Sequence, residues 1–184
     1  MKEKMEDSIH YPIRLRLLTP LKKAMKKIFA IMTTLLIANL VYSQEAVRIK
    51  EKGFEGFIFP KEHSIWGFQP ESNRYTPKFE DIAQAEKILR DSIGTDYVKS
   101  KQNAYRKPPI NKRTLKKYVR QYVGYLTENG EVFILIYFDK GFDKDEFNFS
   151  EDIMCVCDGG GDHWSIKINI STKQLFDMKV NGIS

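Results

Sequence analysis

Cysteine and histidine are scarce in this chain of 184 residues, which holds two cysteines and three histidines. Two cysteines, Cys155 and Cys157, cannot build the disulfide framework that stabilises many small secreted domains. The sequence also has no phosphate loop of the G-x-x-x-x-G-K-[ST] type, no internal repeat and no low-complexity tract. These absences exclude a disulfide scaffold, a P-loop nucleotide site and a repeat protein.

The longest apolar run lies near the N-terminus, at Ile28–Tyr42. It follows the basic segment Met25-Lys26-Lys27 and precedes Ser43-Gln44. A basic segment, a short apolar core and small residues before a cleavage point are typical of a secretory signal peptide. The run is short for a transmembrane anchor, which takes about 20 apolar residues. We therefore expect residues 25–43 to be removed and the mature protein to be periplasmic or secreted, without a membrane span.

Residues 1–24 precede the methionine at which such a signal would begin. They are either upstream of the true start, which we favour, or a long basic extension of the signal. Residues 1–43 hold 8 basic and 3 acidic residues, and the remainder holds 22 and 21. The net charge of +6 therefore belongs mostly to the part that we expect to be absent, and it does not indicate nucleic-acid binding.

The mature chain predicts one α+β domain at residues 76–184, after an irregular aromatic segment at 44–75. A helix is expected at 77–93, because Thr76-Pro77 is a good N-terminal signal and an apolar stripe runs from Phe79 to Ile93 before Gly94. Strands are expected at 57–59, 118–127, 131–139 and 152–158, then at two alternating segments near 163–171 and 174–181, with a hairpin at Asn129-Gly130. The expected fold is one N-terminal helix packed on a four- to five-stranded antiparallel meander.

The helical stripe and the strand alternation together predict the core. Its expected members share an apolar side chain on the inner face of the helix or sheet: Ile82, Leu89, Ile134, Ile136, Ile166, Ile168, Phe176 and Met178.

Five segments carry a resemblance to a family of small exported bacterial proteins. They are 76–89, RQYVGY at 120–125, Asn129-Gly130, DGGGDHW at 158–164 and VNG at 180–182. The family has aliphatic residues where this chain has Cys155 and Cys157, which argues against a shared cysteine chemistry. The resemblance implies export and a single α+β domain, with a cystatin-like or PepSY-like outline, and it implies no activity.

The triple glycine at 159–161 is flanked by Asp158, Asp162 and His163. These side chains are weak candidates for a divalent metal site, since oxygen and imidazole donors bind such ions. We favour a tight turn instead, because glycine supplies positive φ and aspartate bonds nearby backbone groups.

Cys155 and Cys157 could bind a soft metal, or one of them could pair with His63 or His163 in catalysis. We favour two small buried side chains, and no cofactor is predicted.

Charge is strongly divided along the mature chain. Nine basic and no acidic residues lie between Lys99 and Arg120, whereas ten acidic residues lie between Glu128 and Asp162. Either the basic run binds an anionic envelope component or an acidic protein, or it pairs with the acidic segment inside the molecule. The candidate binding residues of this run are Lys112, Arg113, Lys116, Lys117 and Arg120.

Aromatic residues gather before the helix, at Phe54, Phe57, Phe59, Trp66 and Phe68. Trp66 and Phe68 are candidates for a peptide or sugar groove, although burial in the core is favoured for a domain of this size. These features together predict an exported, non-enzymatic binding module. The alternative is a small hydrolase or metal-dependent enzyme that uses residues 155–163.

Overall fold

The computed structural model describes residues 22–32, 45–65, 73–102, 109–141 and 147–182. The chain divides into two units, residues 1–42 and 43–184. Residues 22–32 of the first unit form a helix. Among the described helices, none has both the length and the apolar character needed to cross a membrane.

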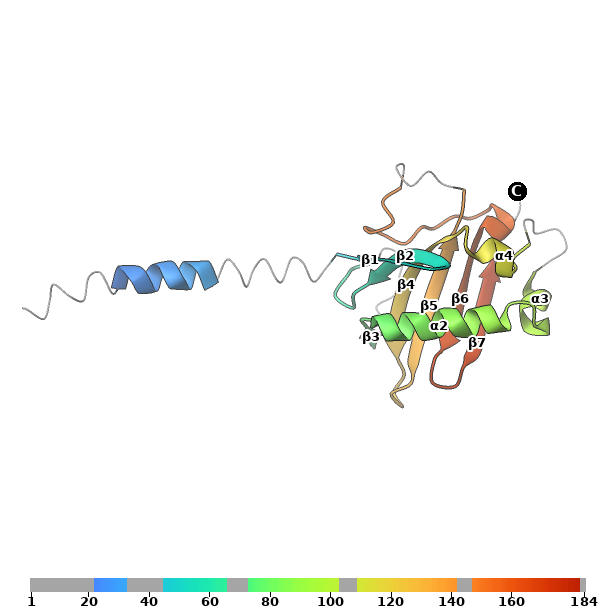
Figure 1. The fold of residues 1–184 in the computed structure, drawn as a ribbon, viewed down its shortest axis with the longest axis horizontal. Helices are drawn as coiled ribbons and strands as arrows, with labels where there is room; N and C mark the ends of the chain where they lie inside the picture. The colour runs from blue at the N-terminus through green and yellow to red at the C-terminus, as the bar shows by residue number, and fades with distance from the viewer. Residues whose placement is uncertain (1–21, 33–44, 66–72, 103–108, 142–146, 183–184) are drawn as a thin grey trace, which may run out of the picture. The chain divides into compact units, whose positions relative to one another are not determined.

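The second unit is built on a sheet of seven strands in the order β1-β2-β4-β5-β6-β7, with β3 also paired to β4 (Figure 1). β2 runs parallel to β4, and the other neighbouring strands are antiparallel. The strands are β1 (Val47–Glu51), β2 (Phe54–Phe59), β3 (Arg74–Tyr75), β4 (Val119–Leu126), β5 (Val132–Asp139), β6 (His163–Asn169) and β7 (Gln174–Val180).

The parallel pairing of β2 with β4 depends on Gly56, which lies opposite Arg120. A Cβ atom on Gly56 would lie 2.3 Å from the carbonyl oxygen of Arg120, which is closer than any real contact. Only glycine therefore allows the two backbones to approach this closely.

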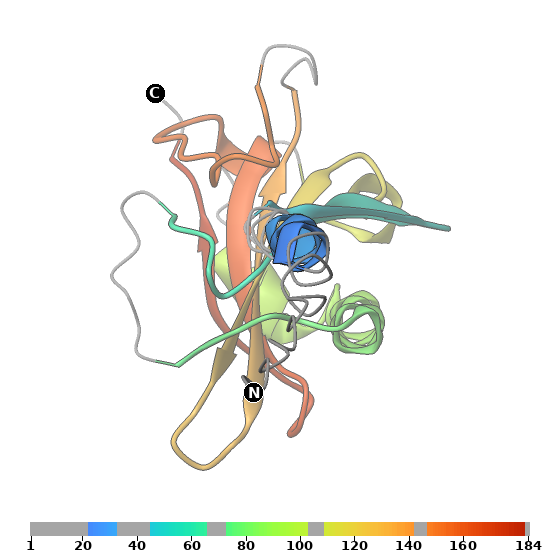
Figure 2. The ribbon, with the colours of Figure 1, turned by 90° about the vertical axis from the view of Figure 1, so that its left-hand side faces the viewer.

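Helix α2 (Phe79–Ser92) lies across one face of the sheet, as Figures 1 and 2 show from two sides. Its buried side chains pack with those of β4 to β7 in one core cluster, and we call this side of the sheet the core face. Every predicted core residue except Phe176 belongs to this cluster. The remaining helical elements are α3 (Asp96–Lys101), α4 (Lys112–Leu115) and the 3₁₀ turn η1 (Gly160–Asp162).

Helix α2 begins two residues later than predicted. The carboxylate of Asp81 accepts a hydrogen bond from the backbone N–H of Lys78 at 2.8 Å, which satisfies a donor at the helix start. Thr76, the expected N-cap, instead accepts a hydrogen bond from the backbone N–H of Lys61 at 2.9 Å. The helix ends as predicted before Gly94, whose φ of +102° favours glycine.

The core face contains an ion pair between Arg120 and Glu86. Arg120 Nε donates to Glu86 Oε1 at 2.7 Å, and the two side chains are 1% and 2% exposed. Tyr122 donates to the same oxygen at 2.9 Å, and Arg120 Nη1 donates to the carbonyl of Tyr118 at 2.8 Å. Burial, with the Glu86 carboxylate beside it, raises the pKa of Tyr122 well above its ordinary value. Arg120 is therefore a core residue that joins β4 to α2, and it does not lie on an exposed basic surface.

Four features of the predicted fold are wrong. The sheet has more strands than the expected four to five, and the helix is not N-terminal because β1, β2 and β3 precede it. Residues 152–158 form no strand; side chains rather than a neighbouring strand bond parts of their backbone. Phe176 leaves the core because the register shifts between β6 and β7, where Asp177 has a φ of +46°. Leu175 packs against the core cluster in its place.

Candidate functional site

The face of the sheet opposite α2, which we call the second face, is partly covered by loops. Residues 60–65 and 147–156 contribute to two smaller clusters around Phe59, Val123 and Val119. The expectation that Phe54 and Phe59 are buried is confirmed, at 9% and 0% exposed. Trp66 and Phe68 lie outside the described residues.

Gln121 holds the second of these loops against the sheet. Its side chain is fully buried and donates to the carbonyls of Phe149 and Asp152 at 2.8 and 2.7 Å. The same side chain accepts a hydrogen bond from the backbone N–H of Met154 at 2.9 Å. At the other end of the loop, Asn181 donates to the carbonyls of Val156 and Asp158. These side-chain bonds satisfy backbone groups of the loop that a strand would have paired with a neighbouring strand.

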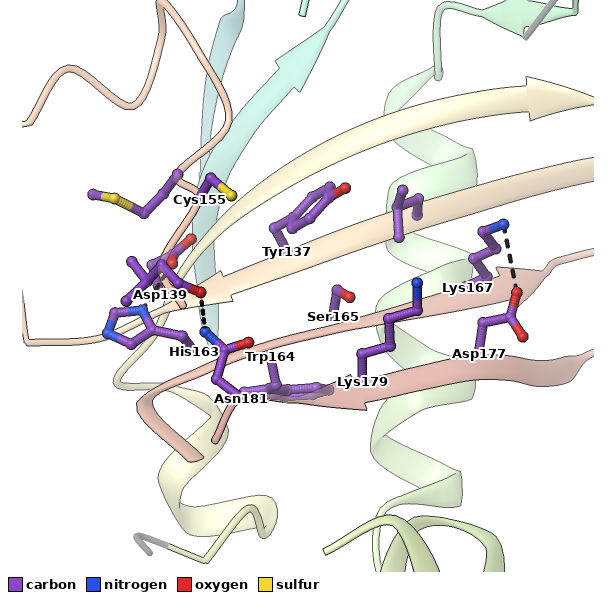
Figure 3. A pocket seen from close by; sticks show the side chains of 13 residues that line it. Tyr137, Asp139, Cys155, His163, Trp164, Ser165, Lys167, Asp177, Lys179 and Asn181 are labelled. Atoms are coloured by element: carbon purple, nitrogen blue, oxygen red, sulfur yellow. Dashed lines mark hydrogen bonds and ion pairs between the residues drawn. The ribbon is translucent and has the colours of Figure 1, made fainter. Parts of the chain in front are cut away.

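A cavity of about 360 Å³ lies between this loop and strands β5 to β7. Figure 3 shows Asp139, His163 and Cys155 at one end of it, and the Lys167–Asp177 ion pair at the other. Tyr137, Ser165 and Lys179 lie between these ends. This cavity is therefore bounded by charged and polar side chains from three adjacent strands.

Asp139 and His163 face each other across β5 and β6, and His163 Nδ1 lies 3.0 Å from Asp139 Oδ1. Asp139 is 4% exposed, and its other oxygen has no hydrogen-bond partner among the described residues. Burial raises the pKa of Asp139, and the contact with His163 partly offsets that rise. The ring of His163 packs so closely on Gly159 that a Cβ there would lie 2.5 Å from it. The imidazole is thus fixed in place by the pair and by the glycine.

The weak metal candidates do not gather around one point. His163 bonds Asp139, Asp162 pairs with Lys140, and Asp158 is exposed. Among the described residues, no group of three or more histidine, cysteine or acidic side chains could hold a metal ion. The predicted turn is confirmed in that Gly159 and Gly160 have φ values of +86° and +56°.

The expectation that Cys155 and Cys157 are buried is wrong, because both are exposed free thiols. The loop that carries them is anchored through the backbone of Met154, but neither cysteine belongs to the two clusters under it. Cys155 lines the same cavity as His163 and Asp139.

Four of the predicted binding residues form an exposed group, which we call the basic surface. It consists of Lys112 and Arg113 in α4 and Lys116 and Lys117 just after it. Within the described part of the chain, none of the four forms an ion pair. Asn111 caps α4, because its side chain accepts hydrogen bonds from the backbone N–H groups of Arg113 and Thr114. This cap holds the backbone that carries Lys112 and Arg113 in a helical turn.

A second cavity of about 580 Å³ adjoins the first on the second face and shares Lys167 and Asp177 with it. Tyr125, Phe133 and Phe176 line it. Sequence reasoning named Cys155 and His163, which line the first cavity, but it missed the other residues of that cavity and all of the second. The available signal was the polar outer face predicted for the last two strands, which includes His163, Ser165, Lys167 and Lys179.

Comparison with known proteins gives no match of any kind. No family model, no curated protein and no solved structure matches this chain. The resemblance to small exported bacterial proteins therefore stays a prediction, and the function has to be argued from the residues themselves.

Proposed function

We propose that this chain is an exported, non-enzymatic binding module that attaches to an anionic component of the cell envelope through the basic surface. The observation that carries the proposal is that Lys112, Arg113, Lys116 and Lys117 are all exposed and lack an ion pair with any described residue. No described carboxylate lies within 4 Å of their charged groups, although residues 142–146 of the acidic segment lie outside the described residues. Four like charges on one short segment repel one another, and an anionic surface would offset that repulsion.

The chemistry of the proposed partner follows from the exposed cations and from the size of their effect. A lysine or arginine near an anionic lipid surface contributes about 1 kcal/mol, so four contribute about 4 kcal/mol. That is enough for weak, reversible attachment that salt abolishes, because the Debye length falls from about 10 Å at 0.1 M salt to about 3 Å at 1 M. We therefore assign the headgroups of anionic lipids as the partner.

Vesicle sedimentation tests this assignment with the purified protein. The protein should bind vesicles that contain phosphatidylglycerol, fail to bind pure phosphatidylcholine, and dissociate at 1 M salt. Reversal of Lys112, Arg113, Lys116 and Lys117 to Glu should abolish binding. A matched control reverses Lys52, Lys78, Lys101 and Lys173, which are scattered exposed lysines without an ion pair to a described residue, and so makes the same change in net charge. Equal loss of vesicle binding in the control would contradict a role for the basic surface in particular. If the protein binds an acidic protein and no vesicles, the partner belongs to the other class.

Export is the second part of the proposal. It is supported by the basic segment Met25-Lys26-Lys27 and the apolar run Ile28–Tyr42 that follows it. Mass spectrometry of the protein from envelope and medium fractions should find an N-terminus at or near Gln44. A cytoplasmic protein that retains residues 1–43 would contradict export.

The second candidate function is a small hydrolase that uses the 155–163 region. It is favoured by one observation, that Cys155, His163 and Asp139 line one cavity. An activated thiolate should react with iodoacetamide much faster than glutathione does at pH 7, and Cys155→Ser should remove that fast phase. The binding-module proposal expects both Cys155 and Cys157 to react at the ordinary rate of an exposed thiol.

A further inference from the structure

The two cavities on the second face form one groove, which we call the sheet groove. They share Lys167 and Asp177, whose side chains pair at 3.5 Å. Their volumes, about 360 and 580 Å³, are each in the range of sites that hold small organic molecules. The sheet groove lies on strands β4 to β7 and involves none of the four residues of the basic surface.

One end of the sheet groove is aromatic. The rings of Phe133 and Phe176 lie with centroids 5.6 Å apart, and Tyr125 lines the same end. Phe176 is there because the backbone at Asp177 adopts a positive φ, which non-glycine residues adopt at a cost. A regular strand would have turned Phe176 into the core, so the irregularity places an apolar ring in the groove. An aromatic or aliphatic ligand group would gain apolar contact at this end.

The middle of the sheet groove, between the aromatic end and the end at Asp139 and His163, carries a cation without an ion pair among the described residues. Lys167 is paired with Asp177, whereas Lys179 is exposed and forms no ion pair with any residue that the structure describes. Lys179 lies opposite Ser165 in the β6–β7 ladder, and both line the cavity. The buried carboxylate that lines the same cavity, Asp139 on β5, is held by His163. An anionic ligand group is therefore the complement of Lys179.

The aromatic end and Lys179 are close enough for one small molecule. Phe176 and Lys179 lie opposite Lys167 and Ser165, which are two residues apart on β6, or about 7 Å at the rise of a strand. The lysine side chain spans part of that distance when it turns along the groove. A carboxylate that is separated from an aromatic ring by three methylenes matches the spacing.

We propose that the sheet groove binds small amphipathic carboxylic acids, with the carboxylate at Lys179 and the apolar group against Phe133 and Phe176. The proposal goes beyond the attachment described above, because it assigns a second site with a different ligand class. The two can fail separately, since the residues that test them do not overlap.

Calorimetric titration with a matched pair of ligands tests the proposal. 4-Phenylbutyrate carries the carboxylate, and 4-phenylbutan-1-ol has the same ring and chain without charge. The purified protein should bind the acid at least fivefold more tightly than the alcohol. Equal affinities, or no heat from either ligand up to millimolar concentration, would overturn the proposal.

Two variants locate the site. Lys179→Met keeps the aliphatic stem and should reduce the affinity for the acid to that for the alcohol, while the affinity for the alcohol stays unchanged. Phe176→Thr should weaken both ligands severalfold. Lys112→Met on the basic surface is the matched control, and it should leave both affinities unchanged. If Lys179→Met behaves as Lys112→Met does, or if Phe176→Thr binds both ligands normally, the assignment is wrong. Far-ultraviolet circular dichroism confirms that each variant is folded.

Discussion

The two faces of the sheet differ in what covers them. On the core face, α2 packs on β4 to β7 and closes off even the charged pair Arg120–Glu86, whose side chains are 1% and 2% exposed. On the second face, loops cover one region and leave the sheet groove open, with Lys179 exposed. A helix can bury a whole face with regular side-chain packing, whereas a loop has to satisfy its own backbone and covers less. The difference teaches that this fold buries one face of the sheet under regular packing and leaves part of the other face open, where we propose that it binds.

Breaking the buried ion pair should have the largest effect. Arg120→Met leaves the Glu86 carboxylate buried without its cation, and we expect a loss of about 3–5 kcal/mol in the free energy of unfolding. The double variant Glu86→Leu with Arg120→Met removes both charges and should recover much of that loss. Urea denaturation measures both. A single variant that loses under 1 kcal/mol would mean that the pair does not hold α2 to the sheet.

Truncating one apolar side chain on each face should show how much each face contributes to the free energy of unfolding. Leu89 is fully buried in the core cluster, so Leu89→Ala should cost about 2–5 kcal/mol. Phe176 is half-buried on the second face, so Phe176→Ala should cost less than Leu89→Ala, although the residue removed is larger. Equal losses in denaturant midpoint would show that the second face contributes as much to stability as the core face.

Releasing the loop should have a smaller and local effect. Gln121→Ala removes three hydrogen bonds to the loop, and we expect about 1–3 kcal/mol of lost stability. Amide hydrogen exchange is the direct measurement. The Met154 amide should lose protection by more than the amides of β5 do. Unchanged protection at Met154 would mean that the aromatic contacts of Phe149, and not Gln121, hold the loop.

The smallest predicted effect concerns pH. Because the pKa of Asp139 is raised in the folded protein, the folded state holds this proton more tightly than the unfolded state does. Its contribution to stability therefore falls as pH rises from the ordinary value of 3.8 through the raised pKa. Asp139→Asn should lack this part of the pH dependence above pH 3.8. Parallel pH profiles of the variant and the wild type would contradict the buried state of Asp139.

Much of the fold could be predicted from the sequence, and the failures have physical causes. The apolar stripe located α2, and the Asn129-Gly130 turn with its flanking apolar runs located β4 and β5. β1 was missed because it is an exposed edge strand with the sequence VRIKE, which has no clear apolar face. Residues 152–158 resemble a strand in composition, but their backbone partners are the side chains of Gln121 and Asn181, which are distant in sequence.

The candidate site could be predicted only in part. The basic residues 112–117 were found from charge alone, and the structure gives them exposed positions. Arg120 belongs to the same basic run, but alternation on β4 points it into the core, and its partner Glu86 lies 34 residues earlier. The sheet groove depends on a positive φ at Asp177, and a pattern of apolar and polar residues with period two cannot reveal such a displacement.

The claim that the second face binds is tested most directly by nuclear magnetic resonance of the ¹⁵N-labelled protein during titration with 4-phenylbutyrate. We expect amide shifts to change at Tyr137, Ser165 and Lys167 on the second face and at Phe176 and Lys179 on β7. The amides of α2 and of the basic surface should stay unchanged. Shift changes confined to α2 or α4, or none at millimolar ligand, would contradict the claim.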